Sequence, residues 1–589
     1  MSLDSAQTHR AWTAANAGPM TQIMGRRWMV AAGHPLAAQA AARILEGGGN
    51  AIDAGVAGGM TLGVVHPDMV SFAGAAPILV HLGATGETFE VSGVGPYPRR
   101  ATADFFRAHC GGQIPSGVLR TVVPASPDSW CVALERWGTL SFKEAVTPAL
   151  ECAERGFPLS PFSASMIRSN VERYRSFPTS AAQYLPGDTP RAPGELFVQA
   201  ELAETIRLMI EGETGARRRG RARAIRAARD VFYKGEIARR IVAFHEREGG
   251  LLAAEDLADF HAEVAPALRG RFREYEVGVC GFWCQVPALL QMLNLIEPYD
   301  FASMGHNSPR ALHRLVEAMK LAFADREAYY GDPRHVKVPA DGLLSKVYAD
   351  ARRALIDDGR AWPEMPPAGD PNGLAALGNG AARSALGTHP AGAPGSLDTS
   401  YVCVVDAEGN AFSATPSDPS VDSPVVPGVG CVVSPRGSQG WLTSGHASEV
   451  APGKRPRLTP APAMLLRGGK IVMPFGTPGG DVQQQAMLQV LLNITAHGMS
   501  PQQAVEAPRV ATRSFPDSFW PHPYHPAQLD AEVGISAQTR AALAALGHVV
   551  VERPERDWRS GAVCVIVVRP DGTLMAGADP RRGAHAVGW

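Results

Sequence analysis

The sequence predicts an α+β protein in which two β-sheets are covered by layers of helices. The first half of the chain carries mainly helical patterns, whereas short apolar, β-like runs become frequent after residue 400. Residues 311–330 place apolar side chains at helical spacing and predict one long amphipathic helix. Blocks of helix, strand, strand and helix in this order are typical of a layered α+β enzyme fold.

The N-terminal half supplies most of the expected helices. Residues 34–65 are rich in Ala and Gly and predict two closely packed helices, split at 47–49. Short strands are expected at 79–81 and 88–91, and helix-rich segments at 128–158 and 195–250.

Residues 360–397 consist largely of Ala, Gly and Pro with isolated hydrophobic residues, which predicts a flexible linker. Beyond it we expect helices at 482–497 and 536–546. The strands expected there lie at 401–405, 411–414, 429–433, 463–466, 471–474, 548–551 and 562–568.

Charge and composition exclude several classes of function. The 589 residues carry a formal net charge of −1, so no global field favours nucleic acid or an anionic membrane as partner. The arginines at 217–229 lack interleaved aromatic residues, which favours a solvated insertion over a nucleic-acid surface. No run of about 18 apolar residues predicts a membrane span.

The compartment is inferred from the cysteines and the first residues. The eight cysteines are scattered through apolar segments and are expected to be buried, reduced thiols. The first 20 residues show no basic start followed by an apolar run, so no secretory signal is recognised. A cytoplasmic location is therefore expected.

The junction between linker and strand offers a nucleophile. Thr399 follows Asp398 at the point where the linker meets a buried strand, so the Asp398–Thr399 peptide bond is open to attack by the Thr399 hydroxyl. Cleavage would give Thr399 a free α-amine with an ordinary pKa of about 7.7–8.0. Such an amine can act as general base for its own hydroxyl. The alternative is an ordinary strand start rich in Ser and Thr.

Attack on an amide also requires donors for the developing oxyanion. Residues 475–481 (FGTPGGD) join a strand to a helix, and the adjacent Gly479 and Gly480 allow backbone N–H groups to approach a substrate. The alternative is an ordinary strand-to-helix turn.

Two other groupings are less favoured. Glu255 and Asp256 are interpreted as capping or solvated groups rather than paired catalytic carboxylates. His522 and His525 resemble half a metal site, but no third ligand is near in the sequence. We therefore expect no metal and no cofactor.

Several blocks together resemble the gamma-glutamyltranspeptidase family over nearly the whole chain. They include HPLAAQAAARILEGGGNAIDA (34–54), DTSYVCVVDAEGNAFSAT (398–415), GKRPRLTPAP (453–462), GTPGGD (476–481) and GADPRR (577–582). The resemblance implies the four-layer αββα sandwich of N-terminal-nucleophile hydrolases and autocatalytic cleavage. It implies a large subunit of residues 1–398, ending in the processing linker 360–398, and a small catalytic subunit of 399–589.

The resemblance also assigns the catalytic residues. It places the nucleophile on Thr399, a supporting hydroxyl on Ser417 and the oxyanion hole on Gly479 and Gly480. Cleavage would fall between Asp398 and Thr399.

The substrate pocket departs from the family pattern. Val94 and Gly95 occupy the slots of the Arg-Glu pair that binds a γ-glutamyl α-carboxylate in the transpeptidases. Where the family has its Asn-rich segment, this chain has 434–439 (SPRGSQ), and the family's paired serines fall on Leu458 and Thr459. These changes imply that Arg436, with Gln439 and Thr459, contacts the substrate, and that Arg436 grips a carboxylate. The alternative for Arg436 is a surface residue in a Pro-Gly turn.

The pattern is most similar to a branch that includes oxamate amidohydrolase. It predicts a self-processing amidohydrolase that cleaves the amide of a small, carboxylate-bearing substrate through an acyl-enzyme. One alternative is a γ-glutamyltransferase or glutathione hydrolase acting on γ-glutamyl donors, and another is a non-catalytic homologue. Expected partners are the small-molecule amide, the two subunits of one precursor, and a second processed pair forming a homodimer.

Overall fold

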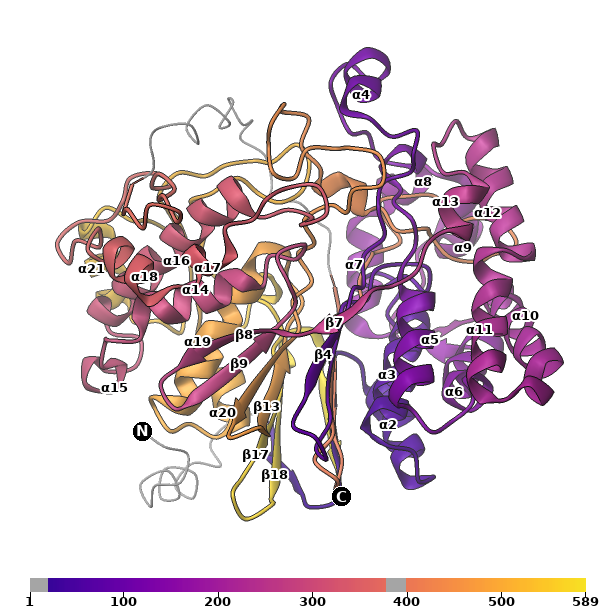
Figure 1. The fold of residues 1–589 in the computed structure, drawn as a ribbon, viewed down its shortest axis with the longest axis horizontal. Helices are drawn as coiled ribbons and strands as arrows, with labels where there is room; N and C mark the ends of the chain where they lie inside the picture. The colour runs from indigo at the N-terminus through magenta and orange to yellow at the C-terminus, as the bar shows by residue number, and fades with distance from the viewer. Residues whose placement is uncertain (1–19, 378–398) are drawn as a thin grey trace.

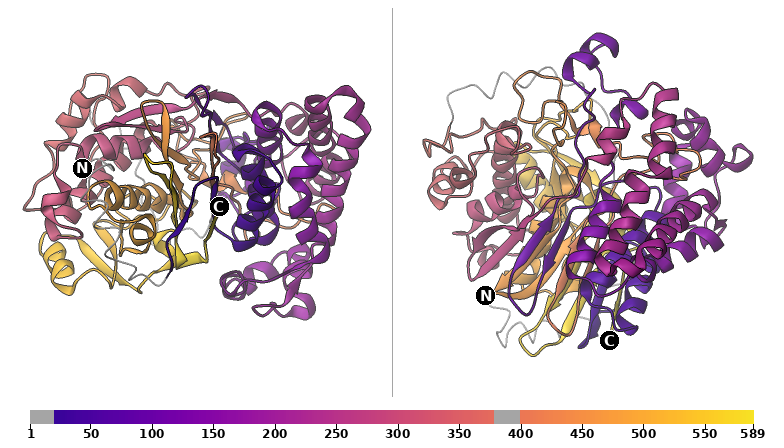
Figure 2. Two further views of the ribbon diagram at one scale, coloured as in Figure 1. Left: turned by 90° about the horizontal axis from the view of Figure 1, so that it is seen from below. Right: turned by 45° about the vertical axis from the view of Figure 1, so that its right-hand side comes forward.

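The computed structural model describes residues 20–377 and 399–589. Two seven-stranded sheets lie face to face between two layers of helices, which gives four layers in the order α, β, β, α (Figures 1 and 2). The α+β class and the sandwich expected from the sequence are confirmed.

All neighbouring strands within the two large sheets run antiparallel. The first sheet has the order β1 (Ile23–Gly25), β18 (Leu574–Ala578), β17 (Cys564–Val568), β13 (Lys470–Gly476), β12 (Ala463–Arg467), β9 (Tyr275–Val279) and β8 (Leu268–Phe272). The second has the order β19 (His585–Gly588), β2 (Met29–Ala32), β10 (Val402–Val405), β11 (Ala411–Ala414), β3 (Ile78–His81), β4 (Thr88–Val91) and β7 (Val264–Pro266).

One helical layer, to the right in Figure 1, covers the second sheet. Its main helices are α2 (Pro35–Glu46), α3 (Ala51–Val65), α5 (Ser126–Trp137), α6 (Phe142–Arg155), α10 (Ala200–Ala216), α11 (Arg221–Tyr233) and α12 (Glu236–Arg247). The opposite layer covers the first sheet with α14 (Pro287–Ile296), α16 (Pro309–Tyr329), α18 (Lys346–Arg353), α19 (Gln483–Thr495), α20 (Pro501–Glu506) and α21 (Ala537–Ala545). A smaller sheet of β14 (Val510–Thr512), β15 (Gln528–Glu532) and β16 (Val549–Arg553) adjoins this layer.

Alternation along β10 divides its side chains between two cores. Val402 and Val404 pack against the α2 and α3 side, whereas Tyr401 and Cys403 belong to the core between the sheets. Because successive side chains of a strand point to opposite faces, Thr399 shares the inward face of Tyr401. The start of β10 therefore directs Thr399 toward the first sheet.

Two sequence predictions are wrong in detail. The expected strand at 429–433 is absent, because Gly430 adopts a φ of +78° and the segment makes isolated bridges from Val432 and Val433 only. The predicted flexible linker begins too early. Residues 361–377 are described and packed, with the Trp362 N–H donating to Glu317 at 3.0 Å and the Gly369 N–H to Asp325 at 3.0 Å. The remaining linker residues, 378–398, lie outside the described residues.

The arginine-rich segment is part of the helical layer rather than a separate insertion. Within α11, Arg229 is buried and pairs with Asp128, while Arg226 pairs with Glu135 at the surface. Arg217–Arg219 forms a short exposed 3-10 turn between α10 and α11. The eight cysteines are unpaired thiols, six of them buried. Among the helices of the described residues, none combines the length and apolarity needed to cross a membrane.

Candidate active site

The candidate site lies at one edge of the sandwich, where strands of both sheets begin or end together. β10 begins there, β11 ends there in register with it, and β13 of the facing sheet ends at Gly476. The two sheets are in close contact at this edge, since a Cβ on Gly476 would stand 2.3 Å from the Tyr401 ring. The loops that follow these strands therefore meet beside Thr399.

The hydroxyl of Thr399 is held by the hydroxyl of Ser417. Their oxygens are 2.8 Å apart, both residues are buried, and an isolated antiparallel bridge aligns their backbones. The Ser400 N–H donates to the Pro416 carbonyl at 2.9 Å, which continues the pairing by one residue. The supporting hydroxyl inferred from the sequence thus lies beside the candidate nucleophile.

Arg436 contacts Ser417 from the other side. Its Nη2 donates to Ser417 Oγ, its Nε donates to Asp418, and its Nη1 donates to Thr459 Oγ1 at 3.1 Å. The guanidinium is fully buried. The alternative of a surface arginine is therefore wrong. Through its hydrogen bond, Arg436 positions the hydroxyl of Ser417.

Asp418 compensates the charge of Arg436. The Asp418 carboxylate also accepts a hydrogen bond from Ser434. Asp418, Ser434 and Arg436 are all buried. Asp418 adopts a φ of +90°, a conformation that costs a non-glycine residue of order 1–3 kcal/mol. A buried ion pair that holds such a backbone indicates that this geometry beside Ser417 is maintained at some cost in stability.

A hydrogen-bonded path continues from Arg436 to the glycine turn. Thr459 Oγ1 accepts from Arg436 and from Gln439 Nε2 at 2.9 Å. Gln285 Nε2 then donates to the carbonyls of Thr459 at 3.3 Å and Gly480 at 3.1 Å. The three residues predicted to contact substrate therefore form one connected group with Ser417.

Gly479 and Gly480 form the turn between β13 and α19, and both need glycine. Their φ angles are +128° and +55°. Asp481, the next residue, accepts from Arg326 Nη1 and from Ser518, which ties the turn to α16. The same Arg326 Nη1 donates to Gln285 Oε1 at 2.7 Å.

The buried charges behind the turn stay ionised. Burial acts to raise the pKa of Glu327, but the guanidinium groups of Arg457 and Arg326 hold it well below its usual range. Arg457 Nη2 lies 2.8 Å from Glu327 Oε1. This network fixes the end of α16 against the glycine turn.

Ser400 points away from Thr399 toward the helical layer. Its Oγ lies 3.2 Å from His66 Nδ1, and a Cβ on Gly33 would stand 2.3 Å from the same oxygen. Burial, with a smaller effect from the positive charge of Arg582, lowers the pKa of His66 to about 3, so the imidazole is neutral. The second hydroxyl of the Thr-Ser pair therefore anchors the strand start.

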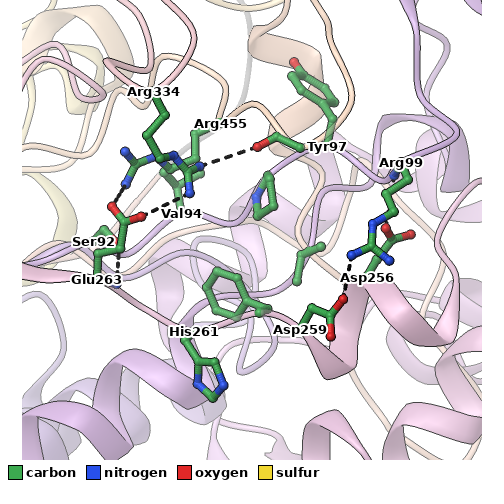
Figure 3. Close-up of a pocket in the computed structure, with 14 residues that line it drawn as sticks. Ser92, Val94, Tyr97, Arg99, Asp256, Asp259, His261, Glu263, Arg334 and Arg455 are labelled. Carbon is green, nitrogen blue, oxygen red and sulfur yellow. Dashed lines mark hydrogen bonds and ion pairs between the residues drawn. The ribbon is translucent and has the colours of Figure 1, made fainter.

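A crevice of about 350 Å³ lies farther along the same edge. Val94 and Tyr97 line it together with charged side chains, and Figure 3 shows Glu263 between Arg334 and Arg455. The hydroxyl of Tyr97 donates to the Gly437 carbonyl at 3.0 Å, which joins the crevice wall to the Arg436 segment. The crevice that Val94 lines is therefore joined to the Arg436 segment through Tyr97.

Arg99 and Arg100 do not replace the missing arginine at Val94. Arg99 makes an exposed ion pair with Asp259, as Figure 3 shows, and Arg100 Nε donates to the Leu251 carbonyl at 3.1 Å.

The groupings set aside in the sequence are structural. Asp256 accepts from the Ala253 N–H at 3.0 Å and caps α13 (Ala254–Ala258). The ring nitrogens of His522 lie 2.8 Å and 3.0 Å from the carbonyls of Asp517 and Gly440, so neither faces a metal.

One buried group, connected to Gly480, thus contains Thr399, Ser417, Arg436, Thr459 and Gln439. Asp398 lies outside the described residues. Sequence reasoning missed four residues that support this group, namely Asp418, Gln285, Arg326 and His66. Asp418 directly follows Ser417, and Asp481, the partner of Arg326, ends the GTPGGD motif, so these neighbours were the available signal. Gln285 and His66 carried none, because their partners are remote in sequence.

Comparison with known proteins places the chain in the family that the sequence blocks resemble. Residues 37–589 match the family described as Gamma-glutamyltranspeptidase. The chain is 35% identical over 570 residues to the Acylase ACY 1 proenzyme of Pseudomonas sp. (strain SE83), covering 94% of this chain and 92% of that protein. It is 32% identical to the Glutathione hydrolase-like YwrD proenzyme of Bacillus subtilis (strain 168), covering 96% and 99%. The cephalosporin acylase of Bacillus halodurans has a similar structure, with a TM-score of 0.83, 27% identity and 98% of each chain covered.

The fold and the edge site define an N-terminal-nucleophile hydrolase sandwich, the architecture that its structural neighbours share. The chain belongs to the gamma-glutamyltranspeptidase family and is an acylase or hydrolase of that family.

Proposed function

We propose that this protein is a self-cleaving amidohydrolase whose nucleophile is Thr399, freed by cleavage of the Asp398–Thr399 bond. The observation that carries the proposal is the buried Thr399–Ser417 hydroxyl pair, with Arg436 donating to Ser417. The relatives are named proenzymes, which supports a precursor that is processed into two subunits.

Hydrogen-bond directions support the role of Thr399. A hydroxyl has one proton to donate and two lone pairs. Because Ser417 Oγ accepts from Arg436, its proton is available for Thr399 Oγ1 at 2.8 Å. The proton of Thr399 Oγ1 then passes to its own α-amine, which acts as general base once the chain is cleaved.

The reaction follows in two balanced halves. Thr399 Oγ1 attacks the amide carbonyl, its proton moves to the α-amine, and the N–H groups of Gly479 and Gly480 stabilise the oxyanion. The intermediate collapses, the leaving amine takes the proton from the ammonium, and an ester on Thr399 remains. Water then attacks the ester with the amine as base, which releases the carboxylic acid and restores Thr399.

The substrate we propose is a small amide whose acyl part carries a carboxylate, of the oxamate kind. Thr459 supports this substrate site, since its oxygen accepts from Arg436 and Gln439 and its proton is left to donate to a substrate oxygen. Arg436 supports this site indirectly, since its guanidinium is paired with Asp418 and holds the hydroxyls of Thr459 and Ser417 in place. Val94, without charge in the slot of the family's arginine, disfavours a γ-glutamyl α-carboxylate there.

A substrate panel tests this proposal. Cleaved protein is assayed with oxamate, other short ω-amides, a glutaryl anilide and a γ-glutamyl anilide, with Thr399→Ala as the blank. Turnover of carboxylate amides that lack an α-amino group is expected. Faster turnover of the γ-glutamyl anilide would instead establish the alternative, a glutathione hydrolase or γ-glutamyltransferase.

If wild type is as inactive as Thr399→Ala on every substrate of the panel, the non-catalytic alternative is favoured.

The cytoplasmic location and a homodimer of processed pairs stay predictions.

A further inference from the structure

A buried cluster on the far side of α16 has the composition of a metal site. His313, Glu317 and His548 each offer a ligand atom, and these atoms lie within 4.8 Å of one another. All three residues are at most 3% exposed. His313 and Glu317 stand four residues apart and so share one face of α16, whereas His548 directly precedes β16.

The two imidazoles are oriented as metal ligands are. His313 Nε2 lies 2.8 Å from the Asp357 carbonyl, and therefore carries the ring proton and leaves the lone pair of Nδ1 facing inward. His548 Nε2 lies 3.0 Å from that Nδ1. Two nitrogens on a tetrahedral zinc ion, each about 2.0–2.1 Å from it, stand roughly 3.3 Å apart, so a small shift of one ring admits the ion.

One ring nitrogen of the cluster, the buried His548 Nδ1, lacks a hydrogen bond within the described residues. The buried Glu317 Oε1 has only the Lys320 ammonium beside it. Glu317 Oε2 is already fixed by the Trp362 N–H at 3.0 Å, which leaves Oε1 facing the cluster. A buried imidazole nitrogen without a hydrogen bond is costly unless a further group is bound.

Lys320 is the remaining charged group at the cluster. Its Nζ lies 2.8 Å from Glu317 Oε1 and donates to the Trp362 carbonyl at 2.8 Å. The ammonium therefore neutralises Glu317 in the metal-free chain and competes with a bound cation. A dication would displace it from Glu317 while the contact with Trp362 is kept.

We propose that His313, Glu317 and His548 bind one Zn²⁺ or a similar divalent transition-metal ion. Two neutral imidazoles and a carboxylate are ligands that zinc prefers. The ion would join α16, before the proposed cleavage point, to β16, after it. The consequence that the ion fastens the two subunits together rests on the proposed self-cleavage, whereas metal binding itself does not.

The protein is first freed of metal with a chelator. Its affinity for Zn²⁺ is then measured by competition with a chromogenic chelator, and the zinc bound per chain is measured by mass spectrometry after gel filtration. Wild type and the uncleaved Thr399→Ala variant are expected to bind one Zn²⁺ per chain equally well. His548→Ala and Glu317→Gln should bind it about tenfold more weakly or worse. Lys320→Met, which removes the competing ammonium, should bind it more tightly.

His497→Ala is the matched control, because the His306–His497 ring pair also connects the two parts of the chain, at 5.2 Å, outside the cluster. It should leave zinc affinity unchanged, and circular dichroism verifies that each variant is folded. The proposal is overturned if wild type binds no stoichiometric zinc, if His548→Ala binds it as tightly as wild type, or if Lys320→Met shows no gain. Zinc binding by Thr399→Ala without cleavage of wild type would uphold the metal site and reject the proposed processing.

Discussion

At the scale of single residues, Ser417 links the buried Arg436 to Thr399, because its hydroxyl is hydrogen-bonded to both. Arg436 is matched by Asp418 on one side and donates to Ser417 on the other. Because Asp418 balances it, the guanidinium can remain buried and still orient the hydroxyl pair. A buried, paired charge used in this way contributes positioning more than stability.

Ser417→Ala should lower kcat by about 100-fold, because Thr399 loses the hydroxyl that directs its proton and supports its oxygen. Ser417→Thr, which keeps a hydroxyl, should recover most of the activity. Steady-state rates on the best amide of the panel measure both. A Ser417→Ala enzyme with unchanged kcat would show that the pair at 2.8 Å is structural.

Asp68, in the loop beside His66, should make stability depend on pH. Burial raises its pKa to about 6, with the positive charge of Arg582 opposing part of that rise. Since the folded pKa exceeds the unfolded value of about 3.9, the stability linked to this group is complete below about pH 4 and is lost as pH rises through 6.

The variant Asp68→Asn removes this ionisation. Between pH 4 and pH 7, the difference in free energy of unfolding should shift in favour of Asn by ~2 kcal/mol, since most of a shift of about two pKa units falls in this interval. Urea unfolding at several pH values measures it. A difference that is constant across this range would refute the raised pKa.

At the scale of elements, the turn 477–480 positions the proposed oxyanion donors between β13 and α19. Gly479→Ala should lower kcat strongly, because a φ of +128° is strained for alanine and the N–H groups would turn away from the substrate. Gly469→Ala is the matched control, since Gly469 also has a positive φ, with open space around it, in the β12–β13 hairpin. Equal kcat in the two variants would argue against the oxyanion role.

Some of the secondary-structure elements could be predicted from the sequence and others could not. The α16 helix and the strands β10, β11, β12 and β13 were predicted, because their apolar patterns are strong and local. The strand β19 was missed, since His585–Gly588 is short and pairs with β2, more than 550 positions away. The packing of 361–377 was also missed, because a few contacts with α16 and Tyr524 outweigh a linker-like composition.

At the scale of the whole molecule, the two proposed subunits are interleaved. In the second sheet, β10 and β11 lie between β2 and β3, and in the first sheet four strands from the C-terminal part lie between β1 and β9. Separation of the subunits would break backbone pairing in both sheets and expose the shared core.

The cleaved protein should therefore elute from gel filtration as one species at neutral pH and separate into two chains only in denaturant. Gel filtration followed by denaturing electrophoresis measures this. Dissociation in native buffer would contradict the interleaved arrangement.

The site could be predicted in part from the sequence. The resemblance to the family proposed Thr399, Ser417, Gly479 and Gly480, and the structure brings the first two side by side. The partners of Arg436 did not, because Asp418 and Thr459 are brought to it only by the meeting of loops from both sheets.

The most direct test of the central claim is the intact mass of purified wild type and Thr399→Ala, together with N-terminal sequencing. Wild type is expected to consist of two chains, the smaller one beginning with Thr399, and Thr399→Ala is expected to remain a single, inactive chain. An active wild-type preparation that contains one intact chain, or a small chain that begins at another residue, would contradict it.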